Sequence, residues 1–187
     1  YDIKIMQAVI LAAGESSRFW PLNTTHKSLV RIMGKSLVEW TIESLRKTGI
    51  NDIIIIQNSS KDIENQLTSE DLKFVVQPEA KGMGNAILQA KNLLKEYFFV
   101  LNPNHMDADY FISLMVEKLN QENSNMVLLG QKTDRPWEYG ILELEGDTAK
   151  NLVEKPKQGK EPSDIRVMGI YLLPPNFLDY YKRVPEH

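Results

Sequence analysis

The sequence predicts an α/β fold, with a mostly parallel mixed sheet and helices on both of its faces. Short apolar, β-branched runs alternate with amphipathic segments as far as Gly130. Alternating strands and helices of this kind form parallel sheets with helical crossovers. Because those crossovers are right-handed, the loops that follow the strands lie along one edge of the sheet, where ligands bind.

The expected strands of this first part are short buried runs. Residues 7–11 form a short, largely apolar run that leads into Ala12-Ala13-Gly14, and residues 52–57 contain four consecutive β-branched isoleucines. Runs of this length between turn residues indicate strands that are buried on both faces. Further strands are expected at 73–76, 97–101 and 126–130.

The expected helices lie between these strands. Residues 37–47 place apolar side chains at helical spacing, and Gly49 follows as a plausible C-terminal cap. Further helices are expected at 61–67, 84–94 and 110–119. For the last of these, Asp109 stands in the position of an N-terminal cap.

The pattern changes after residue 130. Strands are expected at 140–144, 152–154 and 167–173, with no strong helix between them. These strands predict an antiparallel addition that flanks the parallel sheet. The whole chain, residues 1–187, is expected to form a single domain that is truncated at its C-terminal end.

Composition narrows the classes of function. The chain has 187 residues, of which 42% are hydrophobic, and it contains no cysteine, so thiolate chemistry is excluded. A net charge of -3 gives no basic footprint for nucleic acid. The apolar runs are too short to span a membrane and no secretory leader is seen, so we expect a cytoplasmic protein. The sequence leaves homo-oligomerisation open.

The segment that follows the first strand has features of a phosphate-binding loop. Gly14 lets the backbone approach a ligand closely, with N–H groups available for phosphate oxygens. Arg18 can clamp a phosphate with two hydrogen bonds, and Lys27 is a second cation in the same polar stretch. The Gly-Lys-Ser/Thr ending of a P-loop is missing.

The ordered series Leu11–Gly14, Arg18, Pro21-Leu22-Asn23, Lys27 and Gly34–Leu37 resembles the opening of the sugar-nucleotide pyrophosphorylase family. Glucose-1-phosphate thymidylyltransferases are among these sugar-1-phosphate nucleotidyltransferases. The resemblance implies the Rossmann-like nucleotide-diphospho-sugar transferase fold. It also implies catalytic roles for Arg18 and Lys27. The residues that it assigns to nucleotide binding in this segment are Leu11, Ala12, Ala13 and Gly14.

Later motifs resemble the same family. Val76-Gln77-Pro78 and the segment 81–87 are similar to the part that binds the base, which implies nucleotide-binding roles for Gln77 and Gly82. Three further motifs match the segments that bind the sugar phosphate. The residues that the resemblance assigns to that ligand are Tyr139, Gly140, Glu154, Lys155 and Val167.

The sequence departs from the family where a metal is expected. The family holds Mg²⁺ with an aspartate in a Gly-Asp pair after a strand, and here Pro103-Asn104 stands in that place. An amide oxygen is a poor replacement for a carboxylate as a magnesium ligand. Beside Asn104, the nearby carboxylates that could replace the aspartate are Asp107, which we favour, and Asp109, whose position also suits a helix cap. In addition, His26 and Ser28 replace the prolines that usually flank the lysine, and His26 gives no functional signal of its own.

Three functions are therefore weighed. The first is a nucleotidyltransferase that joins a nucleoside triphosphate, with dTTP or UTP favoured, to a sugar-1-phosphate and releases pyrophosphate. The second is a catalytically degenerate regulatory relative that binds nucleotide or nucleotide sugar, which Asn104 favours. The third is a cytidylyltransferase that acts on a small phosphorylated alcohol.

Overall fold

The computed structural model describes residues 1–14, 26–67, 69–121, 124–181 and 183. The chain divides into two compact units. Unit 1 comprises Tyr1–Val127 and Tyr171–His187, and unit 2 comprises Leu128–Ile170. This division into compact units does not decide whether residues 1–187 form a single domain, so that expectation stays a prediction.

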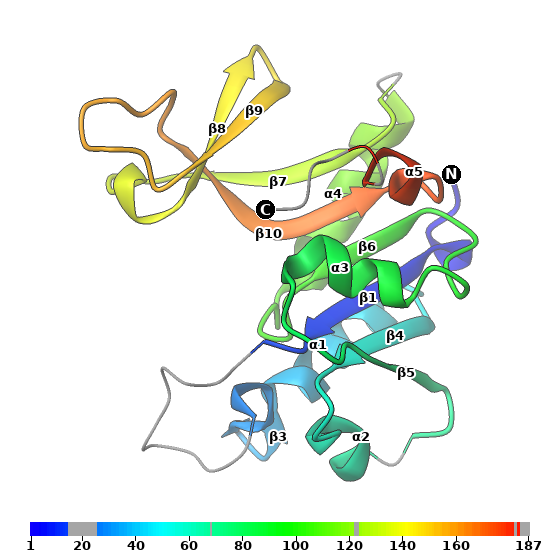
Figure 1. The fold of residues 1–187 in the computed structure, drawn as a ribbon. Coiled ribbons are helices and arrows are strands. Elements are labelled where there is room, and N and C mark those ends of the chain that lie inside the picture. The colour runs from blue at the N-terminus through cyan, green and yellow to red at the C-terminus, as the bar shows by residue number, and fades with distance from the viewer. Residues whose placement is uncertain (15–25, 68, 122–123, 182, 184–187) are drawn as a thin grey trace. The chain divides into compact units, whose positions relative to one another are not determined.

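A parallel sheet forms the centre of unit 1 (Figure 1). Its strand order is β5 (Leu72–Val76), β4 (Asp52–Gln57), β1 (Gln7–Ala12) and β6 (Phe98–Leu101). Each neighbouring pair in this series is parallel. The strand β10 (Ile165–Leu173) follows β6 in the sheet order, and its last residues belong to unit 1. The predicted parallel sheet is therefore confirmed.

Helices pack on this sheet because its strands are apolar on both faces. The helix α3 (Gly82–Gln89) contacts β1 and β4, and its residues share a buried cluster with Val9 and Ile54. The helices α1 (Leu37–Lys47) and α4 (Ala108–Gln121) contact each other and lie behind the sheet in Figure 1. Since side chains alternate along a strand, the sheet buries residues toward both layers. The shorter helices of this unit are α2 (Asp62–Gln66), α5 (Phe177–Tyr181), and the 3-10 helices η1 (Ile3–Ile5) and η3 (Lys27–Leu29).

Two predicted helices have ends that are wrong by two residues or more. The helix expected at 84–94 runs from Gly82 to Gln89, because the chain beyond it tightens into turns in which the amide of Leu93 bonds to the carbonyl of Ala90. The helix expected from residue 110 begins at Ala108, so Asp109 lies inside its first turn. There the Asp109 carboxylate accepts a hydrogen bond from Ser44 of α1.

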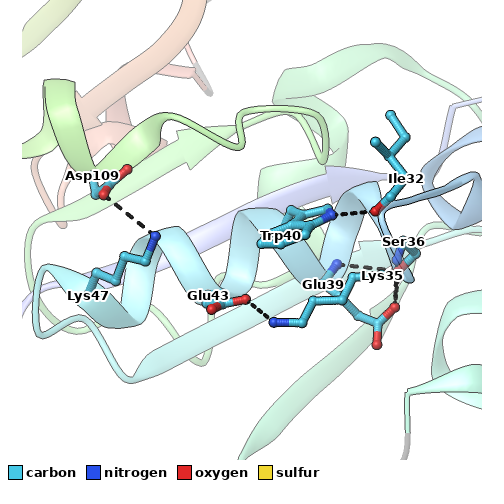
Figure 2. Close-up of polar contacts among 8 residues, drawn as sticks. All are labelled: Ile32, Lys35, Ser36, Glu39, Trp40, Glu43, Lys47 and Asp109. Atoms are coloured by element: carbon cyan, nitrogen blue, oxygen red, sulfur yellow. Dashed lines mark hydrogen bonds and ion pairs between the residues drawn. The ribbon is translucent and has the colours of Figure 1, made fainter.

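A small hairpin leads into α1, and Figure 2 shows the polar contacts at the start of that helix. Its strands are β2 (Arg31–Ile32) and β3 (Lys35–Ser36), and the loop between them has positive φ at both Met33 and Gly34. Ser36 then caps α1, because its hydroxyl accepts from the amide of Glu39 while the Glu39 carboxylate accepts from the amide of Ser36. This capping box fixes where the helix begins.

Unit 2 contains the antiparallel strands that the sequence predicts. The strands β8 (Gly140–Glu145) and β9 (Thr148–Glu154) form an antiparallel hairpin, and β8 also pairs antiparallel with β10. The strand β7 (Val127–Lys132) pairs with β10, and the 3-10 helix η4 (Pro136–Glu138) precedes β8. None of the described helices in either unit has both the length and the apolar character needed to cross a bilayer.

Candidate functional site

A cavity of about 560 Å³ lies in unit 1 at the carboxyl ends of β1, β5 and β6. Its position follows from the parallel sheet, which brings the loops after these strands to one edge. Several residues that the sequence assigns to nucleotide binding or catalysis line it. These residues are Leu11, Ala13, Gly14, Lys27, Gln77 and Gly82.

One predicted residue is described but does not line the cavity, and another is not described. Ala12 is buried and is not part of the lining, because its side chain points to the opposite face of β1 from its neighbours Leu11 and Ala13. Arg18 lies outside the described residues.

At Gly14 the cavity is lined by backbone atoms, because glycine has no side chain. A Cβ atom built on Gly14 would meet no described atom within 4 Å. Its φ lies outside the left-handed region, so its own conformation does not require glycine. What the glycine provides is therefore space beside the backbone rather than a special turn.

Gln77 is held by the start of α3. Its side chain is 5% exposed, and Nε2 donates to the carbonyl of Gly82 at 3.1 Å and to Oδ1 of Asn85 at 3.0 Å. Because a carbonyl can only accept, these contacts fix which end of the Gln77 amide is the nitrogen. Gly82 itself has φ +83°, which favours glycine at this position.

Gly84 is explained by packing. A Cβ on Gly84 would lie 2.3 Å from Cε2 of Tyr181, so this residue lets the tyrosine ring of α5 approach α3. Of the two glycines in the motif at 82–84, only Gly82 lines the cavity.

Lys27 reaches the cavity from η3, between two residues for which the sequence gave no function. His26 and Ser28 are both buried, and both line the cavity beside Lys27. Burial lowers the pKa of His26 below its ordinary value, and the nearby charge of Lys27 lowers it further, against the hydrogen bond to Gly14. The sequence feature that could have drawn attention to His26 and Ser28 is that they replace the two prolines that usually flank the lysine in the family.

The end of β6 contributes amides to the cavity rather than acids. Asn102, Pro103 and Asn104 line it, and its described lining contains no aspartate or glutamate. Asp107 is exposed, is not part of that lining, and uses its backbone carbonyl to accept from the amide of Tyr110. Across the described parts of the chain, no group of three or more His, Cys, Asp or Glu residues could hold a metal ion.

These donors do not fit the Mg²⁺ that the sequence resemblance implies. Magnesium prefers charged oxygen ligands, and Asn104 offers only a neutral amide oxygen. We therefore assign to the described residues no catalytic step that depends on a metal bound by the protein.

Three predicted sugar-phosphate residues come together in unit 2. A Cβ on Gly140 would lie 2.9 Å from Oε2 of Glu154 and 3.4 Å from Cγ1 of Val167. Glycine at position 140 therefore gives the Glu154 carboxylate room beside the backbone of β8. These three residues are contributed by β8, β9 and β10.

Tyr139 and Lys155 are joined through the backbone. The amide of Lys155 donates to the carbonyl of Tyr139 at 3.0 Å, and Lys155 has φ +45°, a strained conformation for a residue with a side chain. The ring of Tyr139 lies under the guanidinium of Arg166, 4.5 Å from its centroid. Tyr139 and Arg166 line a second cleft of about 410 Å³.

Comparisons with known proteins address the family and the fold of this chain. The model of the family described as nucleotidyl transferase matches residues 7–187. Bifunctional protein GlmU of Methanococcus maripaludis is 32% identical over 93% of this chain, and the alignment spans 41% of that protein. UTP--glucose-1-phosphate uridylyltransferase of Staphylococcus epidermidis is 27% identical over 98% of this chain and 76% of its own length. The chain thus spans about two fifths of the first of these relatives.

Solved structures share the fold. UDP-glucose pyrophosphorylase from Acinetobacter baumanii superposes with a TM-score of 0.82 at 24% identity, over 97% of this chain and 79% of that one. A UDP-glucose pyrophosphorylase complexed with UDP-glucose gives a TM-score of 0.78 at 22% identity, over 96% and 80% of the two chains. The predicted fold is confirmed by these likenesses, and from the family match the chain belongs to the nucleotidyl transferase family.

Proposed function

We propose that the chain is a nucleotidyltransferase that joins a nucleoside triphosphate to a sugar-1-phosphate and releases pyrophosphate. One observation carries the proposal. Gly14 and Lys27 are about 50 residues or more from Gln77 and Gly82 in the sequence, yet all four line a single cavity at the carboxyl edge of a parallel sheet. The uridylyltransferase that this chain resembles favours UTP as the nucleotide and glucose-1-phosphate as the acceptor. The resemblance of the sequence to glucose-1-phosphate thymidylyltransferases keeps dTTP beside UTP.

Gln77 and Gly82 would seat the base. Because Nε2 of Gln77 is bonded to Gly82 and Asn85, the atom left to read a base is the carbonyl oxygen Oε1. An oxygen acceptor suits the ring N–H of uracil or thymine, whereas neutral cytosine has no N–H at the equivalent ring nitrogen. This contact favours a uridylyl or thymidylyl donor over the cytidylyl alternative.

Gly14 and Lys27 would hold the phosphates. The open backbone beside Gly14 admits phosphate oxygens, and the Lys27 ammonium offsets their negative charge. A phosphate oxygen of the sugar phosphate attacks the α-phosphorus of the nucleotide. The bond from that phosphorus to the bridging oxygen breaks, and pyrophosphate leaves with the electron pair. Arg18 keeps its proposed phosphate-binding role, which rests on the sequence.

Gly140, Glu154, Lys155 and Val167 would bind the sugar phosphate, together with Tyr139. The carboxylate of Glu154 beside Gly140 can accept from sugar hydroxyls, and the ammonium of Lys155 can pair with the phosphate. The left-handed backbone of Lys155 supports this assignment, since strained residues persist where function fixes them.

Asn104 favours a second candidate function. Without a carboxylate in the described lining of the cavity, the chain could hold a nucleotide or nucleotide sugar without turning it over, and act as a regulatory relative. The two candidates share the nucleotide site and differ only in turnover.

The test measures pyrophosphate release from a panel of triphosphates and sugar phosphates in the presence of Mg²⁺, for the natural protein and for Asn104→Asp. The transferase proposal expects release with UTP or dTTP and glucose-1-phosphate, and a faster rate in the variant. Weakening a metal contact of this kind removes roughly 3–4 kcal/mol of transition-state stabilisation, or about a few hundredfold in rate.

Release that is detected only with Asn104→Asp would instead support the degenerate relative. A protein that binds no triphosphate at millimolar concentration would contradict both candidates. The matched control is Asn102→Asp, which adds the same charge to the lining two residues earlier. If both variants gain activity equally, added charge alone explains the gain.

A further inference from the structure

His26 joins two loops of the cavity through both of its ring nitrogens. The side chain is only 5% exposed. Its Nε2 lies 2.8 Å from the carbonyl oxygen of Gly14, and its Nδ1 lies 2.7 Å from the hydroxyl of Ser28. The backbone amide of Ser28 also donates to Nδ1, at 3.3 Å. One ring therefore contacts the loop after β1 and the turn that carries Lys27.

The partners of the ring decide where its proton lies. The Gly14 carbonyl can only accept, so Nε2 must carry a hydrogen. The Ser28 amide can only donate, so Nδ1 must be bare. Neutral His26 with its proton on Nε2 satisfies every one of these contacts. A proton on Nδ1 would face the Ser28 amide hydrogen, and the contact would become repulsive.

We infer that neutral His26 is a positioning residue that ties the Gly14 backbone to the Lys27 turn, so that both form one frame for the triphosphate. The inference rests on the proposed function, because it assumes that Gly14 and Lys27 bind phosphates. Its basis is the geometry of the tie, which joins residues 12 positions apart. Without the tie, each loop would have to be ordered by the nucleotide itself, which lowers affinity.

The hydrogen bonds of the His26 side chain restrain the backbone of this turn, as the ring of a proline would. His26 has φ −57°, close to the value that proline imposes, so the backbone of the turn already has the conformation that a proline would give. Ser28 differs, because its amide donates to His26 and a proline there would have no N–H. The replacements at 26 and 28 are thus parts of one hydrogen-bonded unit.

The hydrogen bonds that His26 makes depend on pH, whereas the restraint that a proline imposes does not. Burial favours the neutral ring, and Lys27 in the same turn also disfavours a second positive charge. Asp62 of α2 is the described acidic group that acts in the opposite sense. At neutral pH the ring therefore makes all of these contacts. Acid adds a hydrogen to Nδ1, which removes the contact with the Ser28 amide and releases the ring at that end, while Nε2 can still donate to Gly14.

The test compares the natural protein with His26→Gln and His26→Phe. A glutamine can place its amide nitrogen where Nε2 donates to Gly14, whereas phenylalanine fills the space without a donor. Affinity for UTP and for dTTP is measured by calorimetry at about pH 7.5 and about pH 5.5, and thermal melting confirms that each variant is folded.

At the higher pH we expect His26→Phe to bind UTP about tenfold more weakly, since it lacks the tie, and His26→Gln to stay within about threefold. On acidification the natural protein should lose about threefold more affinity than His26→Gln does, because only the natural protein has the Ser28 amide contact that protonation removes. The comparison with His26→Gln corrects for protonation of the nucleotide, which affects both proteins alike.

Folded His26→Phe that binds UTP as tightly as the natural protein would overturn the inference, and so would identical pH profiles for the natural protein and His26→Gln. In both cases the proposed function would stand, because the natural protein still binds. If the natural protein binds neither triphosphate, the proposed function fails, and the inference fails with it.

Discussion

Replacing Gly14 by alanine separates a binding role from a folding role. The added Cβ meets no described atom within 4 Å, and the φ of Gly14 is one that alanine adopts without strain. Alanine also restricts the unfolded chain more than glycine does. We therefore expect Gly14→Ala to leave stability unchanged or to raise it by about 0.4–1 kcal/mol.

The same methyl group should damage nucleotide binding. It would stand in the space through which a phosphate approaches the backbone of the loop after β1. Hydrogen bonds to charged groups contribute about 1.5–3 kcal/mol, so loss of one such contact corresponds to roughly a ten- to hundredfold weaker affinity for UTP. Calorimetric titration with UTP and urea denaturation measure the two effects in the same preparation.

Gly146→Ala is the matched control, because its expected effects are the reverse. Gly146 is exposed at the β8–β9 turn and has φ +59°, so alanine there should destabilise the fold by about 1 kcal/mol and leave UTP affinity unchanged. If Gly14→Ala lost stability as Gly146→Ala does and still bound UTP normally, the reasoning about Gly14 would be refuted.

Three further outcomes are expected. Met33→Asn should raise the free energy of unfolding by about 0.5–1 kcal/mol in urea denaturation, since Met33 has φ +51° in a two-residue hairpin loop that suits Asn-Gly; an unchanged midpoint would contradict this. Gly84→Ala should lower it by about 1–3 kcal/mol, because its Cβ would overlap the Tyr181 ring, and Tyr181→Ala should remove most of that effect. The pH dependence follows from the lowered pKa of His26. Because the unfolded chain binds a proton to this ring more readily, the stability that His26 confers is complete above about pH 6.5 and is lost on acidification; denaturation of His26→Gln should lack that component, and matching profiles would count against it.

Local patterns in the sequence were sufficient for the central elements of unit 1. The bounds of α1 and β4 were predicted as the structure has them, because an amphipathic stripe with a capping serine and a run of isoleucines each satisfy strong local preferences. The α3 helix was shifted, since residues 90–94 keep an apolar stripe while their backbone turns more tightly.

For the candidate site, motifs in the sequence named several residues that line one cavity, but not the contacts that these residues make. Gly14, Lys27, Gln77 and Gly82 were named from motifs, and the parallel sheet brings them to one cavity. Their ligands stay proposals. Gly84 could not be assigned correctly from the sequence, because the ring that approaches it belongs to a helix almost a hundred residues later.

The sequence by itself determined the alternation of strands and helices, the family, and the missing acid at position 104, since all three depend on residue type and local spacing. Only the tertiary structure decided that Asn85 holds Gln77 and that His26 bridges Gly14 to Ser28. The reason is physical. A buried polar side chain must find hydrogen-bond partners wherever the fold brings them, and sequence spacing does not reveal which groups those are.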